Sequence, residues 1–346
     1  MGNSLPQSKA APPKSRFELV SVIGRGGYGK VWQVTQKPSN RTFAMKSMKK
    51  SQVIAKKSVH SVLNERRLLT HLKHPFIVNM QQAFQDAEHL YLVMDLMPGG
   101  DLRFNFARAR HFTENQVRFF VACVVTALEY LHLNGIVHRD VKPENLVLDA
   151  RGYLRLTDFG IAQHLQNTSS FSGTPGYMAP EVMARQPYGV QADYFAVGVL
   201  VYEFMKGRRP YVGRSRKEIK DHMAAQQVML KRSEVPTGWS LEAADFVNKL
   251  LVRKPADRLG ANGPLEVKNH SWLRDFNWKR LFEKTLEPPY CPQSANNFDE
   301  SMYQHWAEEP EVGRLPIGYD ALFADYVFNS EVESPLVTAS TAALPR

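Results

Sequence analysis

The eight residues His138–Asn145, His-Arg-Asp-Val-Lys-Pro-Glu-Asn, constrain the fold and chemistry of this chain more than any other stretch. They place two carboxylates, an ammonium group and a carboxamide close together, and the apolar run 146–148 follows at once. The pattern predicts a polar loop that leads into a strand, and polar groups on a loop held by a rigid scaffold are typical of a reaction centre. A further carboxylate, Asp158, follows the strand-like run 153–156.

The side chains of these two segments favour magnesium and phosphate chemistry. Asp140, Asn145 and Asp158 supply oxygen ligands and a base, which suit Mg²⁺ better than zinc. The chain has two cysteines, Cys123 and Cys291, so a disulfide framework is not expected and the chain is interpreted as intracellular.

A glycine-rich segment near the N-terminus predicts a second phosphate-binding element. Residues 24–31 read Gly-Arg-Gly-Gly-Tyr-Gly-Lys-Val within an alternating segment, 17–34, and this predicts a hairpin. Small residues in its turn allow backbone N–H groups to approach phosphate oxygens. The G-x-G-x-x-G spacing alone is a weak signal, and a dinucleotide-binding fold would need a helix after the turn. The strand-like run 31–34 follows instead, which excludes that fold.

Three further motifs complete a pattern that resembles a eukaryotic Ser/Thr protein kinase. They are Phe-Ala-Met-Lys at 43–46, Asp-Phe-Gly at 158–160 and Ala-Pro-Glu at 179–181. The resemblance implies an α+β, bilobal protein-kinase fold, with a small, mostly β N-lobe that carries one key helix and a larger, mostly α C-lobe. The kinase domain is expected at 17–272, with the N-lobe at about 17–95, the hinge at about 95–100 and the C-lobe at about 101–272.

Helical periodicity agrees with this division. Apolar residues at helical spacing in 58–72, with Glu65 in the middle, predict the N-lobe helix. Thr113-Glu114-Asn115-Gln116 predicts a capping box that starts a long C-lobe helix, which Gly135 ends.

The two ends of the chain differ from the domain between them. Residues 1–16 offer little to bury and are expected to form a flexible arm. Residues 273–346, with Asn297-Phe298-Asp299 and an aromatic motif at 323–328, resemble the C-terminal tail of AGC kinases. We expect the rings of that motif to dock beside the helix at 58–72. Several motifs resemble cAMP-dependent kinase catalytic subunits, whereas Gly-Gly-Asp-Leu-Arg at 99–103 resembles the YANK branch, and both relationships stay open.

The resemblance implies ATP and Mg²⁺ as cofactors and gives each catalytic residue a role. Asp140 would accept the proton of the substrate hydroxyl, Lys142 would stabilise the transferring phosphoryl group, and Asn145 and Asp158 would bind the metal. Lys46, paired with Glu65, would hold the α- and β-phosphates. The expected ATP-binding residues are Ile23, Gly24, Arg25, Gly26, Gly27, Tyr28, Gly29, Lys30, Val31, Ala44, Lys46, Met94, Asp95, Met97, Val147 and Phe298.

Substrate recognition is also implied by matching positions. Asp101, Glu144 and Glu203 match acidic residues that bind arginines two and three positions before the phosphorylated hydroxyl, and Thr174 completes the set. We therefore expect Arg-Arg-x-Ser/Thr followed by an apolar residue, although the basic run 208–217 would favour an acidic partner instead.

Regulation is expected in the activation segment. Ser170 is the predicted phosphosite, where a phosphate would pair with Arg139. The predicted partners are protein substrates with basic motifs, together with an upstream activating kinase or a regulatory subunit.

Other classes of function are less well supported. A pseudokinase scaffold would lack one of Lys46, Asp140, Asn145 or Asp158, and all four are present; the Ala-Pro-Glu motif argues against a small-molecule kinase. The formal charge of +10 comes from dispersed residues without a zinc-ligand or RNA-binding signature, so no nucleic-acid partner is expected. The expected location is cytoplasmic, and acylation of Gly2 leaves weak membrane contact open.

Overall fold

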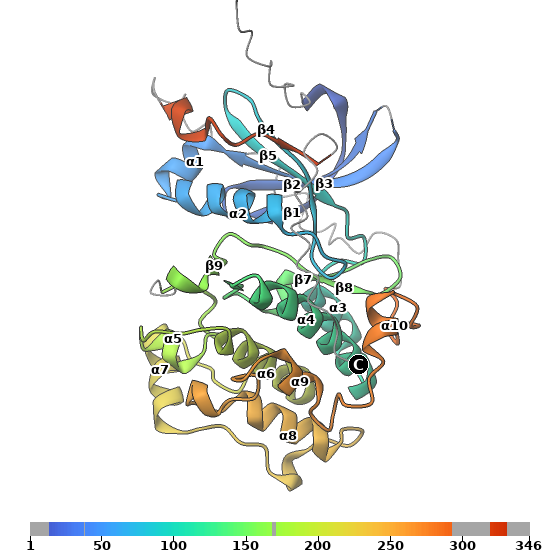
Figure 1. Ribbon diagram of the computed structural model, residues 1–346, viewed down its shortest axis with the longest axis vertical. Coiled ribbons are helices and arrows are strands. Elements are labelled where there is room, and N and C mark those ends of the chain that lie inside the picture. The colour runs from blue at the N-terminus through green and yellow to red at the C-terminus, as the bar shows by residue number, and fades with distance from the viewer. Residues whose placement is uncertain (1–13, 38, 168–170, 293–318, 331–346) are drawn as a thin grey trace, which may run out of the picture. The chain divides into compact units, whose positions relative to one another are not determined.

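The computed structural model describes residues 14–37, 39–167, 171–292 and 319–330, which form two compact units (Figure 1). The first unit contains the described residues up to Lys73, Asn79–Leu96 and the tail segment 319–330. The second contains His74–Val78 and the described residues from Met97 to 292. The first is mostly sheet and the second mostly helix, so the predicted α+β class is confirmed.

The first unit is an antiparallel sheet with the strand order β1-β2-β3-β5-β4-β10. Its strands are β1 (Phe17–Gly26), β2 (Gly29–Gln36), β3 (Arg41–Lys49), β4 (Met80–Gln85), β5 (His89–Asp95) and β10 (Phe328–Asn329). Two helices accompany the sheet, α1 (Lys50–Ala55) and α2 (Val59–His71), and a 3₁₀ turn spans Tyr319–Phe323. The helix predicted at 58–72 is therefore confirmed as α2, whereas α1 was missed because its six residues are too few for a clear periodicity.

Side-chain alternation gives the central strand β3 two different faces. Phe43 and Met45 join a buried cluster that includes Val34, Tyr91 and Val93. Successive residues of a strand point to opposite faces, so Lys46 lies on the other face from Met45. The sheet thus separates an apolar core from the face that carries the candidate lysine.

The aromatic tail motif is buried in the first unit. Phe323, Tyr326 and Phe328 are 0%, 0% and 3% exposed. The motif adds β10 to the edge of β4, and Arg66 of α2 donates a hydrogen bond to the carbonyl of Val327 (Figure 1). The predicted docking beside the 58–72 helix is confirmed, and the strand pairing is an additional finding.

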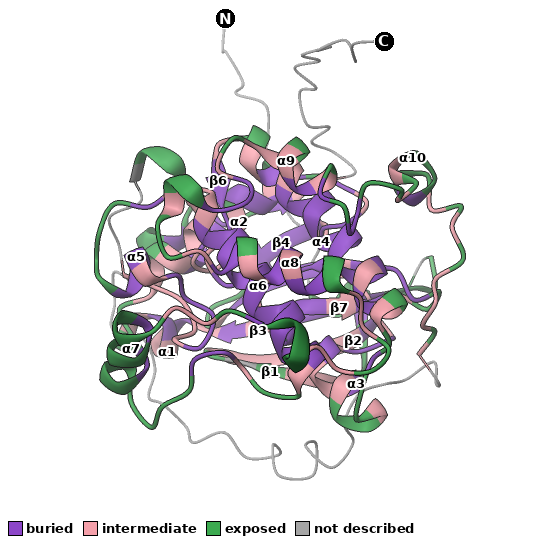
Figure 2. Ribbon diagram, turned by 90° about the horizontal axis from the view of Figure 1, so that it is seen from below, coloured by how far each residue is buried: buried purple, intermediate pink, exposed green. Residues whose placement is uncertain are grey.

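The second unit is built around two long helices that are buried along most of their length, as Figure 2 shows. Its helices are α3 (Leu102–Ala109), α4 (Glu114–Leu133), α5 (Pro180–Met183), α6 (Gln191–Lys206), α7 (Arg216–Ala225), α8 (Leu241–Leu250), α9 (Pro264–Lys268) and α10 (Trp278–Phe282). Two short antiparallel pairs carry its loops: β6 (Ile136–Val137) with β9 (Gln163–His164), and β7 (Leu146–Leu148) with β8 (Leu154–Leu156).

Helix α4 begins and ends as its sequence predicts. Thr113 accepts a hydrogen bond from the backbone N–H of Gln116 at 3.3 Å, and the Gln116 side chain accepts one from Thr113 at 2.9 Å. Gly135, just beyond the helix, has a φ of 69°, a left-handed conformation that favours glycine. Length and apolar composition alone would allow α4 to cross a membrane, but 67% of its apolar window is buried inside the unit, as in a core helix. Burial also raises the pKa of the Cys123 thiol in α4 to about 12, as is typical of an unreactive buried cysteine.

The docked tail motif predicts a stability effect. Removal of residues 321–346 takes away three buried rings, so the free energy of unfolding of the first unit should fall by at least ~3 kcal/mol. A thermal melt measures this change, and a chain that ends at Ser330 is the control because it keeps all three rings. Equal melting temperatures for the two shortened chains would contradict the importance of the docking.

Candidate active site

The first unit holds its candidate lysine in an ion pair. Lys46 Nζ lies 2.9 Å from both carboxylate oxygens of Glu65. The Glu65 side chain is 3% exposed, and a buried carboxylate is costly unless a cation neutralises it. Strand β3 supplies the lysine and helix α2 supplies the glutamate, so the orientation of α2 decides whether the pair forms.

The docked tail lies close enough to influence this pair. The pKa of the Tyr326 phenol is raised well above its ordinary value, first by burial and then by the negative charge of Glu65. Arg66, the next residue of α2, binds the backbone of Val327. The tail motif and the glutamate that pairs with Lys46 are therefore held by the same helix.

The glycine-rich segment forms the β1–β2 hairpin, whose last pair is Gly26 and Gly29. A Cβ at Gly29 would lie 2.0 Å from the carbonyl oxygen of Ser47, so β3 approaches too closely for any side chain there. A Cβ at Gly27 would meet nothing within 4 Å, so the backbone at the tip faces open space that a side chain would fill. A bare, open turn is what close approach to a phosphate requires.

The other predicted ATP-binding residues are distributed over both units. In the first unit, Ala44 pairs with Met94 across β3 and β5, and the Asp95 carboxylate accepts a hydrogen bond from Gln81 at 2.8 Å. The hairpin residues among them are Ile23, Gly24, Arg25, Tyr28, Lys30 and Val31. In the second unit, Met97 is buried and Val147 lies in β7. Phe298 lies outside the described residues.

In the second unit, the catalytic-loop residues form one hydrogen-bonded cluster. Asp140 Oδ2 accepts a hydrogen bond from Lys142 Nζ at 2.6 Å, and Asp140 Oδ1 accepts one from the Thr174 hydroxyl at 2.7 Å. Lys142 Nζ also lies 2.9 Å from Thr174 Oγ1. Asn145 Nδ2 donates to the carbonyl of Asp140 at 2.8 Å and to its Oδ2 at 3.0 Å. The four predicted residues are thus brought together around one carboxylate.

The predicted metal ligands fit a magnesium ion bound together with phosphate. Asn145 donates both bonds to Asp140 through its amide nitrogen, so its carboxamide oxygen is the atom suited to a metal. The backbone carbonyl of Asn145 accepts a hydrogen bond from Thr157 at 3.0 Å, and this ties its loop to the exposed Asp158. Asp158 has a φ of 65°, an unusual conformation for a non-glycine residue. Mg²⁺ is usually held by one or two protein oxygen ligands together with water and substrate phosphate oxygens, which fits a carboxamide and a carboxylate at this position.

Sequence reasoning missed the buried carboxylate that holds this loop. Asp193 of α6 accepts hydrogen bonds from the backbone N–H groups of His138 at 2.9 Å and Arg139 at 2.8 Å, and from His132 Nε2 at 2.9 Å. Arg139 has a φ of 72°, so the bond to its N–H stabilises a strained backbone. The signal was an aspartate in a nearly all-apolar helix, which requires buried partners.

His138 joins the two loops of the site. Its Nδ1 accepts a hydrogen bond from the Asp140 N–H at 3.3 Å, while its Nε2 lies 3.1 Å from the carbonyl oxygen of Thr157. The Phe159 ring packs edge-on against the imidazole, with 5.2 Å between the centroids. The segment that ends in Asp158 is thus anchored to the segment that carries Asp140.

A buried arginine anchors the glutamate of the Ala-Pro-Glu motif. Arg258 donates to both carboxylate oxygens of Glu181, at 2.7 and 2.9 Å, with both side chains buried. A bidentate pair of this kind fixes the end of the activation segment. Ser170, the predicted phosphosite, lies outside the described residues.

The predicted substrate carboxylates are partly committed to partners within the chain. Asp101 caps α3 by accepting a hydrogen bond from the Phe104 N–H at 2.8 Å. Burial raises the pKa of its carboxyl, and the nearby charge of Glu144 adds to the increase. Glu144 and Glu203 both accept hydrogen bonds from Arg103, a residue that sequence reasoning did not assign to the site.

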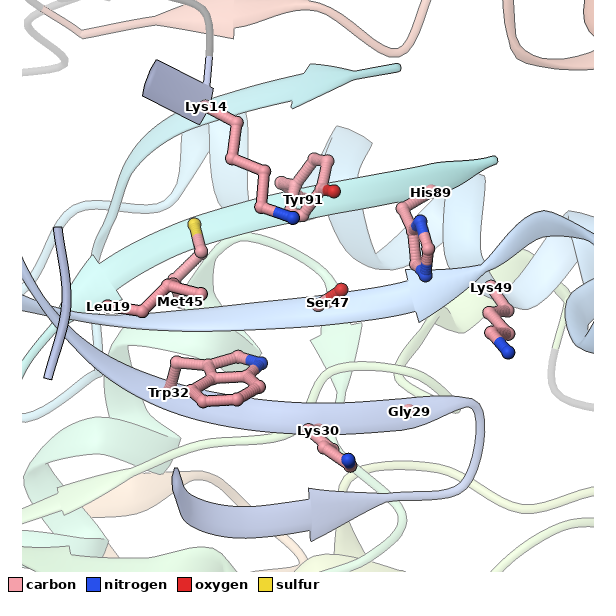
Figure 3. A pocket seen from close by; sticks show the side chains of 10 residues that line it. All are labelled: Lys14, Leu19, Gly29, Lys30, Trp32, Met45, Ser47, Lys49, His89 and Tyr91. Carbon is pink, nitrogen blue, oxygen red and sulfur yellow. The ribbon is translucent and has the colours of Figure 1, made fainter. Parts of the chain in front are cut away.

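The first unit also contains a pocket of about 140 Å³ (Figure 3). Met45, Ser47 and Lys49 of β3 line it, and strand alternation puts these residues on the face opposite Lys46. Trp32 and Tyr91 form its aromatic lining. Gly29 and Lys30, which were predicted to bind ATP, also line it. Lys30 pairs with Ser47 across β2 and β3, so its side chain lies on the face opposite Lys46.

An ion-paired lysine, an open glycine turn and a carboxylate–lysine–carboxamide cluster define a phosphotransferase of the protein-kinase class. Residues 17–273 match the family model described as the protein kinase domain, and the chain belongs to this family. The similar curated proteins are named as serine/threonine-protein kinases or as a cAMP-dependent protein kinase catalytic subunit.

Three of these relatives show the breadth of the similarity. A probable serine/threonine-protein kinase of Dictyostelium discoideum is 39% identical over 84% of this chain and 64% of its own length. The cAMP-dependent protein kinase catalytic subunit of the same organism is 34% identical over 93% of this chain and 50% of its own length. The serine/threonine-protein kinase Sgk1 of Bos taurus is 36% identical over 90% of this chain and 73% of its own length. The AGC resemblance is thereby confirmed, and the chain spans about half to two thirds of the first relatives it matches.

Asp193 predicts a pH-dependent stability. Its pKa is lowered in the folded protein: burial opposes the shift, but the hydrogen bond and charge of His132 and the donors around it outweigh burial. Because the pKa of Asp193 is lower in the folded than in the unfolded protein, the ionised carboxylate stabilises the fold at pH values above the ordinary aspartate pKa of ~4. This stabilisation is lost as the pH falls from that value through the lower pKa of the folded protein. Asp193→Asn places an amide N–H donor against the existing donors, so the melting temperature of the variant at pH 7 should be lower. The variant should also lose less of its melting temperature than the unmutated protein when the pH is lowered, because it has no carboxylate to protonate at this position. The exposed Asp221→Asn is the control, and identical pH profiles for all three proteins would contradict the role of Asp193.

Proposed function

We propose that the protein transfers the γ-phosphoryl group of ATP, with Mg²⁺, to serine and threonine hydroxyls in arginine-containing sequences. The observation that carries this proposal is the cluster around Asp140, in which Lys142, Asn145 and Thr174 all hydrogen bond to one carboxylate. Membership of the protein kinase family supports the same reaction.

Each residue of the cluster has its own role in an in-line displacement at the γ-phosphorus. Asp140 orients the substrate hydroxyl and accepts its proton as the bond from oxygen to the γ-phosphorus forms and the bond to the departing ADP breaks. Lys142, 2.6 Å from Asp140, places a positive charge where the transferring group carries negative charge. Thr174 orients Asp140 and faces the position that the substrate hydroxyl would take.

The remaining residues hold the nucleotide and its metal. Lys46, fixed by Glu65, binds the α- and β-phosphates, and the bare turn at Gly27 covers phosphate oxygens with backbone N–H groups. Asn145 and Asp158 would bind Mg²⁺, which would supply positive charge to neutralise the phosphates. Positioning and charge neutralisation supply most of the rate increase in such transfers.

Three carboxylates of the second unit support the preference for basic sequences. Glu144 and Glu203 lie close enough to bind a single guanidinium group, that of Arg103. Burial raises the pKa of the Asp101 carboxyl, and the nearby negative charge of Glu144 raises it further. Carboxylate pairs match the planar fork of arginine. The similarity to a protein named as a cAMP-dependent protein kinase catalytic subunit supports a regulatory-subunit partner.

The proposal includes a cytoplasmic location, which rests on the composition of the chain. Acylation of Gly2 would add weak membrane contact, since one acyl chain anchors a protein only marginally. Gly2 lies outside the described residues.

Catalytic substitutions test the proposed reaction. Lys46→Met, Asp140→Asn and Asp158→Ala should each reduce ³²P transfer from ATP by at least ~100-fold in folded protein. Lys46→Met should also lower the melting temperature, because it leaves the buried Glu65 carboxylate unpaired. The substrate is an Arg-Arg-x-Ser peptide, compared with an acidic and a proline-directed peptide, each with and without Mg²⁺. The exposed Lys217→Met is the matched control. Normal turnover by Asp140→Asn would refute the mechanism, and faster transfer to the acidic peptide would refute the substrate class.

Phosphorylation of Ser170 by an upstream kinase is proposed to activate the enzyme. Arg139, beside Asp140, is the residue that would pair with the phosphate and order the activation segment. Mass spectrometry of active protein should find phosphate on Ser170, and Ser170→Ala should lower the rate, whereas Ser172→Ala should not. Full activity of Ser170→Ala, without phosphate between Gln163 and Ser172, would contradict this proposal.

A further inference from the structure

Arg103 occupies the two carboxylates that the substrate proposal assigns to arginine binding. Its Nε donates to Glu144 at 2.8 Å, and its two terminal nitrogens donate to the two oxygens of Glu203 at 2.9 and 3.2 Å. All three guanidinium nitrogens are therefore engaged. The pair with Glu203 is bidentate, the geometry in which arginine binds carboxylates most specifically.

The local structure explains why Arg103 reaches this position. It is the second residue of α3, which Asp101 caps, so its backbone is fixed close to the catalytic loop. Helix α3 packs against the 3₁₀ turn that contains Glu144, and Glu203 lies in α6. The arginine thus joins three separate segments of the second unit.

Tyr177 completes the arrangement from the activation segment. Its hydroxyl accepts a hydrogen bond from Arg103 at 2.5 Å and donates one to Glu203. Burial raises the pKa of Tyr177, and the negative charge of Glu203 raises it further, so the phenol stays protonated as a donor. The guanidinium of Arg209 lies 5.7 Å from the Tyr177 ring.

Burial explains why these carboxylates need a cation at all times. The Glu203 side chain is 9% exposed, and an unpaired carboxylate at that depth is costly. Arg103 is 33% exposed and Glu144 44% exposed, so the guanidinium lies at the surface end of the cluster. An arginine at that depth is accessible to exchange with an arginine from outside.

We propose that Arg103 acts as an internal substitute for a substrate arginine and thereby sets the specificity of this kinase. The inference rests on the proposed function, because it concerns the same acidic subsite. A substrate arginine gains the Glu144–Glu203 pair only when Arg103 leaves it.

The competition favours the internal group. A tethered side chain acts at an effective concentration in the millimolar range or above, whereas a substrate is dilute. A substrate arginine that binds this pair must also displace the three hydrogen bonds that Arg103 already makes to Glu144 and Glu203. The unmutated enzyme should therefore discriminate weakly between arginine and alanine at the one position that this pair serves.

The test compares two peptides that differ only in the two arginines before the serine, Arg-Arg-x-Ser and Ala-Ala-x-Ser. The ratio of their kcat/KM values measures arginine discrimination in the full chain. Arg103→Met keeps the aliphatic stem and removes the charge, so this ratio should rise about tenfold, the effect of ~1.4 kcal/mol of added discrimination. Arg103→Lys keeps a cation without the fork and should give an intermediate ratio.

Arg108→Ala is the matched control, since it removes the same charge from the same helix and should leave the ratio as it is in the unmutated protein. Melting temperatures verify that each variant is folded. If Arg103→Met does not fold, the ratio measured for Arg103→Lys tests the proposal instead. A ratio within twofold of the unmutated value in the folded variants, or a fall in the ratio, would overturn the proposal. Binding of the same peptides, followed by fluorescence anisotropy, separates this inference from the reaction: loss of turnover with an increased arginine dependence of binding would refute the proposed function alone.

Discussion

A buried carboxylate in α6 is the constraint on which the catalytic loop depends. Asp193 accepts hydrogen bonds from the N–H groups of two consecutive loop residues, His138 and Arg139, and the second bond stabilises Arg139 in its left-handed conformation. The strained residue immediately precedes Asp140, so the direction of the catalytic carboxylate follows from a contact made by a residue far along the chain. The apolar helix α6 therefore positions the loop that carries Asp140, in addition to its contribution to the core.

The first unit applies the same principle to Lys46. An ammonium group on a strand is useful only if it is held in place, and Glu65 of α2 does this at 2.9 Å. The aromatic tail motif packs where α2 carries Glu65 and Arg66, so a segment near residue 328 contributes to the geometry of a pair formed by residues 46 and 65. Long-range support of this kind lets a tail influence a reaction without touching a substrate.

Most of the architecture could be predicted from short-range patterns. Alternation marked the strands, helical spacing marked α2 and α4, and Thr113 with Gln116 marked the start of α4, because each signal depends on neighbours in sequence. Motif spacing also identified Asp140, Lys142, Asn145 and Thr174 as members of one site, and the structure brings them together.

The features that were missed depend on contacts between distant residues. Nothing in the residues around Arg103 indicates that it reaches Glu203, one hundred positions away. Asp193 and β10 are similar cases, since their partners lie in other elements. Sequence patterns identify which residues have the right chemistry, whereas the tertiary fold decides which of them are already paired with each other.

The strand β10 has a consequence for how the protein behaves among other molecules. It covers the outer edge of β4, where Phe328 pairs with Ala83 and the Ser330 N–H donates to the Gln81 carbonyl. An uncovered edge offers unpaired N–H and C=O groups to any extended chain, including another copy of the same protein. By placing part of its own tail along this edge, the chain protects the sheet from intermolecular strand pairing and thus from a common route to aggregation.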